Sequence, residues 1–420
     1  MATRKPRRFN PFAALGPGLV TGAADDDPSG IATYSQAGAQ FGYRLLWTVI
    51  FTYPFLAMFQ LTCAEIARVS GRGLAANMKR SFPRAIVAGV VALLLVANIL
   101  NIAADIAAMG EAATLITGGN RYVLAAGFAL LALFLQVFIP YHRYVGLLKW
   151  LTLALFAYVG VVLITGVDGP ALAAALLHPA WPSNAAMAMM VVALLGTTIS
   201  PYLFFWQSAQ ELEEMGVHHS QPLRRTPARA PAEFRRLAID SWGGMAVTLV
   251  ISLCIMLGTS ATLNAHGITH IDSAAQAALA LRPLAGDFAF ALFAIGIIGT
   301  GMLAVPVLAG SAAYALSELM GWRAGLELKP REAQGFYAII AAAISIALAL
   351  DFSGVPPILA LYWSAIVNGV VAVPVMVVIM LLARRHATMG SFTVRGWHMA
   401  LGWGAVLLMA TASVAMFVLM

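Results

Sequence analysis

The sequence predicts an all-α integral membrane protein with about 11 transmembrane helices. Of its 420 residues, 61% are hydrophobic and only 10% are charged, whereas soluble domains contain roughly 45–50% apolar and about 25% charged residues. The apolar residues also gather into stretches close to the ~20 residues that a helix needs to cross the hydrocarbon core. This composition excludes a water-soluble enzyme as the main body of the chain.

The apolar stretches define the expected crossings, with ends that are placed to within a few residues. The predicted crossings are 13–40, 45–67, 85–109, 121–140, 146–167, 187–210, 241–263, 288–316, 335–351, 356–382 and 397–419. The longest polar connection is the basic, Pro-containing segment 211–239. We therefore expect no separate soluble domain.

The distribution of positive charge sets the expected orientation. All but three of the 25 Lys and Arg residues fall in the basic tail 1–12, or in every second connection after it or at its edge; the exceptions are Arg44, Arg121 and Arg282. Since cytoplasmic loops carry the excess of Lys and Arg, the N-terminus is predicted to be cytoplasmic and the C-terminus extracytoplasmic, in the plasma (inner) membrane. The net charge of +7 is spread over these short loops and does not indicate a nucleic-acid partner.

The first crossing contains the most costly polar cluster. Asp25, Asp26 and Asp27 lie in apolar sequence and are followed by Pro28, Ser29 and Gly30. Pro removes a backbone donor and Gly weakens helix propagation, so we expect the helix to be unwound here. Unwound backbone at membrane depth is tolerated where it lines a cavity or is buried in protein. Its free carbonyls, beside a carboxylate, would make an oxygen-rich cation site.

The sixth crossing is predicted to be broken as well. Residues 196–202 read GTTISPY, with Pro201 after small hydroxyl residues that include Thr197 and Ser200. Interrupted helices at corresponding positions of two halves indicate a transporter built on an inverted repeat. We therefore expect a LeuT-type fold with broken helices 1 and 6. Its repeats would be 13–167 and 187–382, and the crossing 397–419 would lie outside the symmetry.

Two further polar side chains lie within predicted crossings. Asp105 in the third crossing would either relay protons or make a structural polar contact. Asn368 in the tenth is more typical of a hydrogen bond between helices than of a ligand. Both are kept as candidates for a supporting role around the site.

The motifs at these breaks resemble one family. Residues 16–43, GPGLVTGAADDDPSGIATYSQAGAQFGY, resemble the first crossing of the Nramp divalent-metal transporters, whose hallmark there is D-P-G-N. The segments ARVSGRGLAANMKRSFP and GTTISPYLFFWQS resemble the loop after the family's second crossing and its sixth crossing. The resemblance covers essentially the whole chain, and it implies metal-ion transport rather than catalysis.

The resemblance also implies a metal site. By this resemblance Asp27 is the family's metal-binding Asp, and Ala24 stands where a backbone carbonyl ligand is expected. Gly30 replaces the family's ligand Asn, and Ser200 replaces its Met. A Met thioether favours transition metals over Ca²⁺ and Mg²⁺, so its loss points to a harder ion. A related branch with this pattern carries Mg²⁺.

The proton path of the family is mostly missing. Tyr202 and Gln207 replace two His residues that the family associates with proton movement, and Asp105 matches a family acid whose partner Glu is replaced here by Ala108. Asp25 and Asp26 are left as side chains that attract cations or contact the water of a hydrated ion.

The expected function is therefore transport of a divalent metal cation, Mg²⁺ or Mn²⁺, with weak or no proton coupling. The alternatives are a proton-coupled symporter of Mn²⁺ or Fe²⁺, a transporter of an organic cation with Asp27 as counter-ion, and a membrane-embedded metal-dependent enzyme. Against the enzyme, no nucleophile–base motif is readable in the crossings. The expected partners are the metal ion, as substrate, and the lipid bilayer, and no cofactor is expected.

Overall fold

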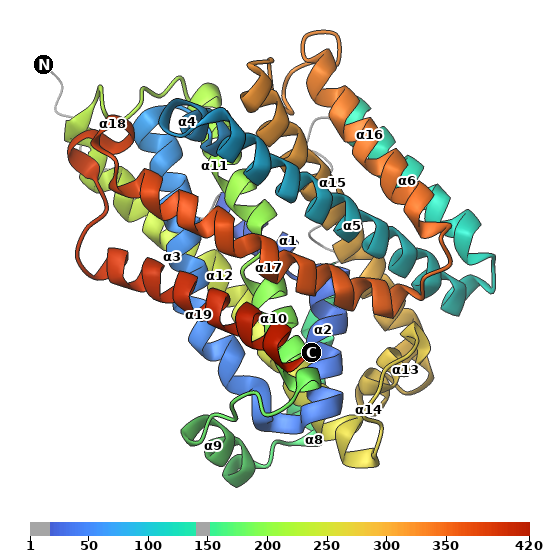
Figure 1. Cartoon of the computed structure of the whole chain (residues 1–420). Helices are drawn as coiled ribbons and strands as arrows, with labels where there is room; N and C mark the ends of the chain where they lie inside the picture. The colour runs from blue at the N-terminus through green and yellow to red at the C-terminus, as the bar shows by residue number, and fades with distance from the viewer. Residues whose placement is uncertain (1–16, 140–151) are drawn as a thin grey trace, which may run out of the picture.

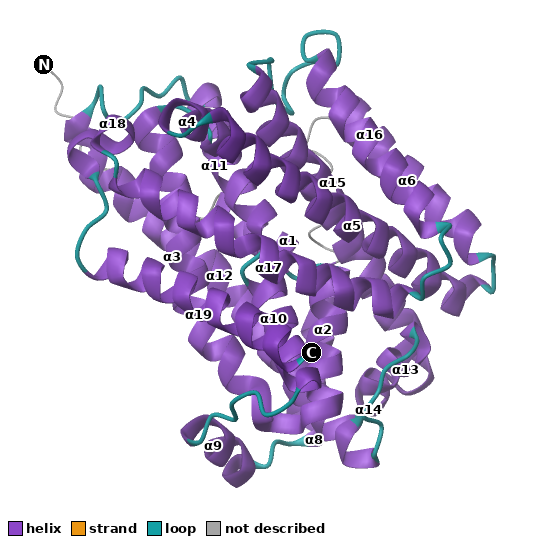
Figure 2. Ribbon diagram, in the orientation of Figure 1, coloured by secondary structure: helices purple, strands orange, loops and turns teal. Residues whose placement is uncertain are grey.

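The computed structural model describes residues 17–139 and 152–420, and all regular structure within those ranges is helical (Figure 2). The tail predicted at 1–12 lies outside the described residues, as does the first part of the crossing predicted at 146–167. Figure 1 shows long helices running side by side, with α4 and α18 at one end of the molecule and α9 and α14 at the other. This is the expected all-α membrane architecture.

The predicted breaks in the first and sixth crossings are both present. The first crossing consists of α1 (Pro17–Asp25) and α2 (Pro28–Phe41), and the sixth consists of α10 (Ala185–Thr198) and α11 (Pro201–Val217). Each second half begins with a proline in its first turn, preceded by the N-cap residues Asp27 and Ser200. Proline is favoured there because its missing N–H would have no helical partner.

The other long helices correspond to the remaining predicted crossings except 146–167, which is described only from residue 152 onward and contains a short helix. These are α3 (Leu46–Ser70), α5 (Arg84–Thr117), α6 (Arg121–Phe138), α12 (Ala230–Thr262), α15 (Ala289–Met320), α16 (Gln334–Asp351), α17 (Pro357–Arg384) and α19 (Trp397–Leu419). Shorter helices connect or flank them: α4 (Leu74–Ser81), α8 (Ala157–Thr165), α9 (Gly169–Leu177), α13 (Ala274–Ala278), α14 (Arg282–Ala285) and α18 (His386–Met389).

The number of crossings depends on how bent segments are counted. Within the described ranges, nine helical segments are long and apolar enough to span a membrane, or ten if Leu153–Thr165 and Gly169–Leu177, bent by 115°, form one span. One of the nine, Pro28–Ser70, is a continuous helical segment that holds two predicted crossings, because a 3₁₀ turn at Gly42–Leu45 joins α2 to α3. Counting that segment as two crossings and the bent pair as one gives eleven, the number that the sequence predicts.

The broken helices are enclosed by long unbroken ones. α12 packs against α1, α2 and α3, whereas α5 packs against α15, α16 and α17. α10 lies against α17, so the sixth crossing is held between α17 and α3. Both breaks are therefore kept away from lipid, as unwound backbone requires.

α10 and α17 approach unusually closely beside the second break. A Cβ on Gly196 would clash with the carbonyl oxygen of Ala365 and the backbone nitrogen of Gly369. Only glycine fits at such a contact, and small residues are what allow membrane helices to pack backbone against backbone. This contact fixes the end of α10 two residues before it unwinds.

The polar connection predicted at 211–239 is largely helical, since α11 extends to Val217 and α12 begins at Ala230. The charged residues that suggested a loop pair with one another across helix ends instead. Arg236 lies 2.7 Å from Glu211 and 3.1 Å from Glu214, and Arg68 of α3 lies 2.9 Å from Glu233. We call these five residues the ion-pair network of α3, α11 and α12.

Candidate metal-binding site

Asp27 lies at the first break and is buried, with 2% of its surface exposed. As N-cap of α2, its Oδ1 accepts a 2.7 Å hydrogen bond from the backbone N–H of Gly30. Its Oδ2 accepts a 3.2 Å bond from the Asn101 side-chain amide of α5. The carboxylate is thus fixed from two helices, and each oxygen keeps lone pairs for a cation.

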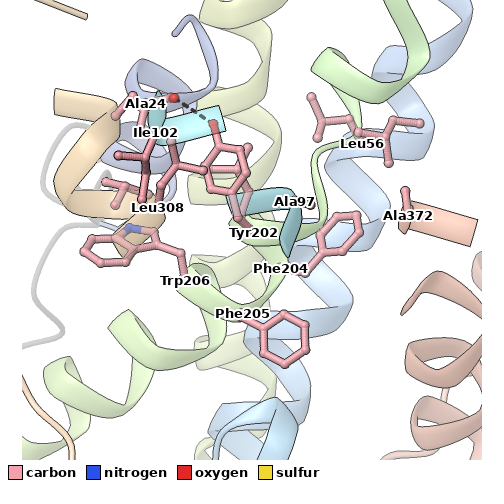
Figure 3. Close-up of a cluster of buried hydrophobic side chains, with 14 of the residues drawn as sticks. Ala24, Leu56, Ala97, Ile102, Tyr202, Phe204, Phe205, Trp206, Leu308 and Ala372 are labelled. Atoms are coloured by element: carbon pink, nitrogen blue, oxygen red, sulfur yellow. Dashed lines mark hydrogen bonds between the residues drawn. The ribbon is translucent and has the colours of Figure 1, made fainter. Parts of the chain in front are cut away.

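The hydroxyl of Tyr202, in the first turn of α11, reaches the same place. It donates to the carbonyl oxygen of Ala24 at 3.1 Å and lies 3.3 Å from Oδ2 of Asp27. Figure 3 shows the Tyr202 ring pointing from the α11 side of the core to the Ala24 carbonyl. The two oxygens expected as ligands therefore face one point, which the phenol hydroxyl now contacts.

Gly30 brings α2 against the end of α10. A Cβ at this position would lie 3.3 Å from Oγ1 of Thr197 and 3.4 Å from the carbonyl oxygen of Asp25. Both neighbours are oxygens, so the space that an Asn side chain would fill in the family pattern is here bounded by a hydroxyl and a carbonyl. Thr197 is 2% exposed. Its hydroxyl, which belongs to the second break, lies close to the first break.

Ser200 is buried at the second break, but its side chain does not cap α11. Its hydroxyl bonds back to the carbonyl oxygens of Gly196 and Thr197, at 2.9 and 3.0 Å. The hydroxyl proton is therefore directed to the unwound end of α10, and the oxygen lone pairs of Ser200 remain available to bind a cation.

Three more buried acids surround this centre. Asp25, Asp26 and Asp105 are each at most 1% exposed, and none of their carboxylate oxygens has a hydrogen-bond partner among the described residues. Arg68 is the one buried Lys or Arg side chain within the described ranges, and it pairs with Glu233 of the ion-pair network. The acids thus have no buried basic side chain to neutralise them.

The remaining predicted residues lie around the breaks. Gln207 of α11 accepts a 2.7 Å hydrogen bond from the Thr21 hydroxyl of α1. This bond links α1, which precedes the first break, to α11, which follows the second. Asn368 of α17 is 1% exposed and its Oδ1 has no partner among the described residues. It adjoins Gly369, the residue against which Gly196 packs.

The donor set is made of oxygen atoms rather than of a cluster of acids and histidines. No group of three or more His, Cys, Asp or Glu side chains in residues 17–139 and 152–420 is arranged to hold a metal ion. None of the histidines described is buried. A metal ion at Asp27 would therefore rely on carbonyl, hydroxyl and water oxygens besides this carboxylate.

Asn101 is a part of the site that the sequence reasoning missed. It lies one helical turn before Asp105 on α5, and this spacing of four places both side chains on one face. A further buried amide, Asn98, lies on the same helix and donates to the carbonyl oxygen of Leu308 at 2.9 Å. The row of polar residues on an otherwise apolar helix was the available signal.

A cavity approaches the site between the second half of the first crossing and the first half of the sixth. It has a volume of about 430 Å³ and is lined by α2 (Ala32, Gln36), α10 (Met190), α17 (Tyr362) and the segment 270–272. Ala32 is one turn beyond Ser29, whose hydroxyl contacts that of Ser364 at 3.3 Å. Ala32 lies five residues from Asp27 along α2, so the lining of this cavity extends toward the first break.

Solved structures of low sequence identity share this fold. A manganese transporter of Eremococcus coleocola, in complex with an aromatic bis-isothiourea substituted compound, superposes with a TM-score of 0.78 at 17% identity and covers 98% of this chain and 88% of its own. Mhp1, a nucleobase-cation-symport-1 family transporter, superposes with a TM-score of 0.56 at 14% identity over 96% and 92% of the two chains. These likenesses support the LeuT-type fold.

Sequence comparisons extend along most of the chain. A divalent metal cation transporter MntH of Yersinia pestis is 29% identical over 309 residues, which is 71% of each chain. Another, of Verminephrobacter eiseniae, is 27% identical over 365 residues, or 84% of this chain and 78% of its own. The family model described as natural resistance-associated macrophage protein-like matches residues 18–419. The chain therefore belongs to the Nramp family.

Proposed function

We propose that this protein carries a hard divalent cation, Mg²⁺ or Mn²⁺, across the membrane through a site at Asp27. The observation that carries the proposal is the convergence of the Asp27 carboxylate and the Ala24 carbonyl at the break between α1 and α2. Family membership and relatives named divalent metal cation transporters support the same function. They also weigh against the membrane-enzyme alternative.

Electrostatics favours a cation at this place. Four buried aspartates surround the first break and α5, and no buried Lys or Arg of the described residues pairs with them. A buried charge is costly unless it is paired or coordinates a metal. A dication between the breaks would supply the missing positive charge during transport.

Ligand chemistry favours a hard ion. Asp27, Ala24, Thr197 and Ser200 all offer oxygen, and Gly30 leaves room beside Thr197 and the Asp25 carbonyl. Mg²⁺ is held through one or two carboxylates and keeps several waters, and Mn²⁺ accepts carboxylate, carbonyl and water ligands. An organic cation would need a wider space, whereas the Asp27 carboxylate is in direct contact with Asn101 and Tyr202.

The membrane potential can drive such uptake. Moving a doubly charged ion through 100 mV is worth about 4.6 kcal/mol, at about 2.3 kcal/mol per charge. We infer an inner-membrane location with the basic connections on the cytoplasmic side, which places the cavity of Ala32 and Gln36 on the outer side. The ion would enter there, pass the two breaks, and leave beside the ion-pair network of α3, α11 and α12.

The test is uptake of Mg²⁺, Mn²⁺ and Ca²⁺ into proteoliposomes, with metal binding measured by calorimetry on the same protein. Asp27→Ala should abolish uptake and binding while the protein remains inserted and folded. Asp287→Ala, which removes an exposed acid of a connecting segment, is the matched control and should behave as wild type. Uptake by Asp27→Ala with near-normal affinity would move the site to Asp25 and Asp26.

A further inference from the structure

A second, positively charged pocket lies far from the aspartates, at the end of the molecule where α4 and α18 are seen in Figure 1. It has a volume of about 430 Å³ and is lined by Ser70, Gly71, Arg72, Pro222, Arg224 and Arg225. We call this the arginine pocket. It joins the end of α3 to the segment that connects α11 with α12.

The walls of the arginine pocket are held in place by backbone contacts. The N–H groups of Leu223 and Arg224 donate to the carbonyls of Arg68 and Val69 at 3.1 and 3.4 Å, so the last turn of α3 is covered by the connecting segment. The Asn77 amide of α4 bonds to two of the lining residues, at Ser70 Oγ and at the Arg72 carbonyl, both at 2.9 Å. The pocket is therefore a feature of packed elements rather than of a free loop.

The positive charge in this pocket is not balanced locally. Neither Arg72, Arg224 nor Arg225 has an ion pair within the part of the chain that the structure describes; the Arg224 guanidinium donates to the Ala387 carbonyl of α18 at 2.7 Å. Nearby acids are engaged elsewhere: Glu233 pairs with Arg68 and Arg236, and Glu318 accepts from the backbone N–H of Ala76.

The guanidinium groups also repel one another. Partial burial, followed by repulsion from Arg80 and from the two pocket arginines of the connecting segment, lowers the pKa of Arg72 below its ordinary value. Like charges that are held together without a counter-ion are relieved when an anion binds among them. Arginine forks fit the oxygens of a phosphate group through paired hydrogen bonds.

We propose that the arginine pocket binds a phosphate group, supplied either by the headgroup of an anionic phospholipid or by a free phosphate-bearing anion. Arg72 and Arg225 would bind its oxygens from two sides, with Ser70 and Arg224 at the edge. Basic residues close to the cytoplasmic face attract anionic lipid, and a free anion would reach the same groups from water.

Occupancy would join three elements at the inner end of the transporter. Arg72 follows α3, Arg225 belongs to the segment after α11, and Arg224 is bonded to α18. The anion would thus hold the segment that follows the half-helix α11 against the end of α3. Arg72 lies only four residues from Arg68 of the ion-pair network. A bound phosphate is expected to stabilise this arrangement against thermal unfolding.

The test uses the full chain purified in a neutral detergent. Its unfolding temperature is measured against sodium phosphate at constant ionic strength, and separately against phosphatidylglycerol with phosphatidylcholine as reference; native mass spectrometry counts retained lipid. Arg72→Gln combined with Arg225→Gln should weaken binding at least about tenfold. Arg229→Gln combined with Arg331→Gln removes equal charge from exposed residues outside the pocket and should bind as wild type.

The outcomes separate the sources and decide the proposal. A shift with phosphatidylglycerol alone identifies the lipid headgroup, and a shift with phosphate identifies a free anion. The proposal is overturned if wild type and the pocket variant bind with equal affinity, or if the control variant loses affinity as much as the pocket variant does. It is also overturned if neither phosphate nor phosphatidylglycerol stabilises the wild-type protein. If the Gln pair fails to fold, Arg72→Lys with Arg225→Lys decides: this pair keeps charge but loses the fork, so unchanged affinity counts against the site.

Discussion

The hydroxyl of Tyr202 lies 3.3 Å from Oδ2 of Asp27 and 3.1 Å from the Ala24 carbonyl oxygen, so one side chain of the sixth crossing contacts both expected ligands of the first. A phenol donates a single proton, and a metal ion needs the same oxygens. Tyr202 therefore competes with the cation for these two oxygens as well as holding the breaks together.

Removing this hydroxyl should strengthen metal binding. In Tyr202→Phe the Ala24 carbonyl and Asp27 lose a competing donor worth about 0.5–1.5 kcal/mol, so the dissociation constant for Mn²⁺ should fall by up to about tenfold. Calorimetry on the purified protein measures this. Tyr43→Phe, at a partly buried tyrosine away from the breaks, is the control. Weaker binding by Tyr202→Phe would instead identify the hydroxyl as a metal ligand.

A sulfur at the second break should change selectivity. Ser200→Met replaces an oxygen by a thioether, which prefers softer ions, and releases the carbonyls of Gly196 and Thr197. Uptake should shift from Mg²⁺ toward Cd²⁺, by about tenfold in the ratio of initial rates. Ser391→Met, at an exposed connecting position, should leave the ratio unchanged. A wild-type protein that excludes Mg²⁺ and prefers Cd²⁺ would refute the hard-ligand interpretation.

Metal uptake should occur with little or no acidification of the liposome interior. His is the side chain that titrates near neutral pH, and none of the described histidines is buried. Asp105 is buried without a hydrogen-bond partner among the described residues, and Ala108 follows where a relay acid would be needed. A pH-sensitive dye trapped in proteoliposomes tests this expectation. Acidification that tracks metal uptake and disappears in Asp105→Asn, but not in Asp287→Asn, would make Asp105 the proton carrier.

Breaking the ion-pair network should destabilise the protein. Arg236→Gln leaves the carboxylate of Glu211, whose side chain is fully buried, without its 2.7 Å partner, and such a loss costs about 3 kcal/mol or somewhat less at this partly exposed arginine. The melting temperature of the purified protein should fall. Adding Glu211→Gln should restore part of the loss, as a coupled pair requires. Additive losses from the two substitutions would show that the pair is not coupled.

Much of this architecture could be predicted because it depends on local chemistry. Three acids followed by proline at Pro28, and hydroxyl residues followed by proline at Pro201, cannot continue an apolar helix, and both breaks lie at those prolines. The crossings could be predicted from the length of the apolar stretches, because a helix needs about 20 apolar residues to cross the membrane. The polar segment 211–239 was predicted less well, since pairing of Arg236 with Glu211 and Glu214 allows charged residues to stay in helices.

The sequence by itself determined the all-α membrane class, the two broken helices and the candidate Asp27, because a bilayer tolerates charge and unwound backbone at few places. Only the tertiary structure decided which residues meet Asp27. Asn101 is 74 residues away and Tyr202 is 175 residues away along the chain, and their side chains converge because helix packing brings α5 and α11 to the first break. Contacts between such distant residues depend on how the helices pack, which no local pattern specifies.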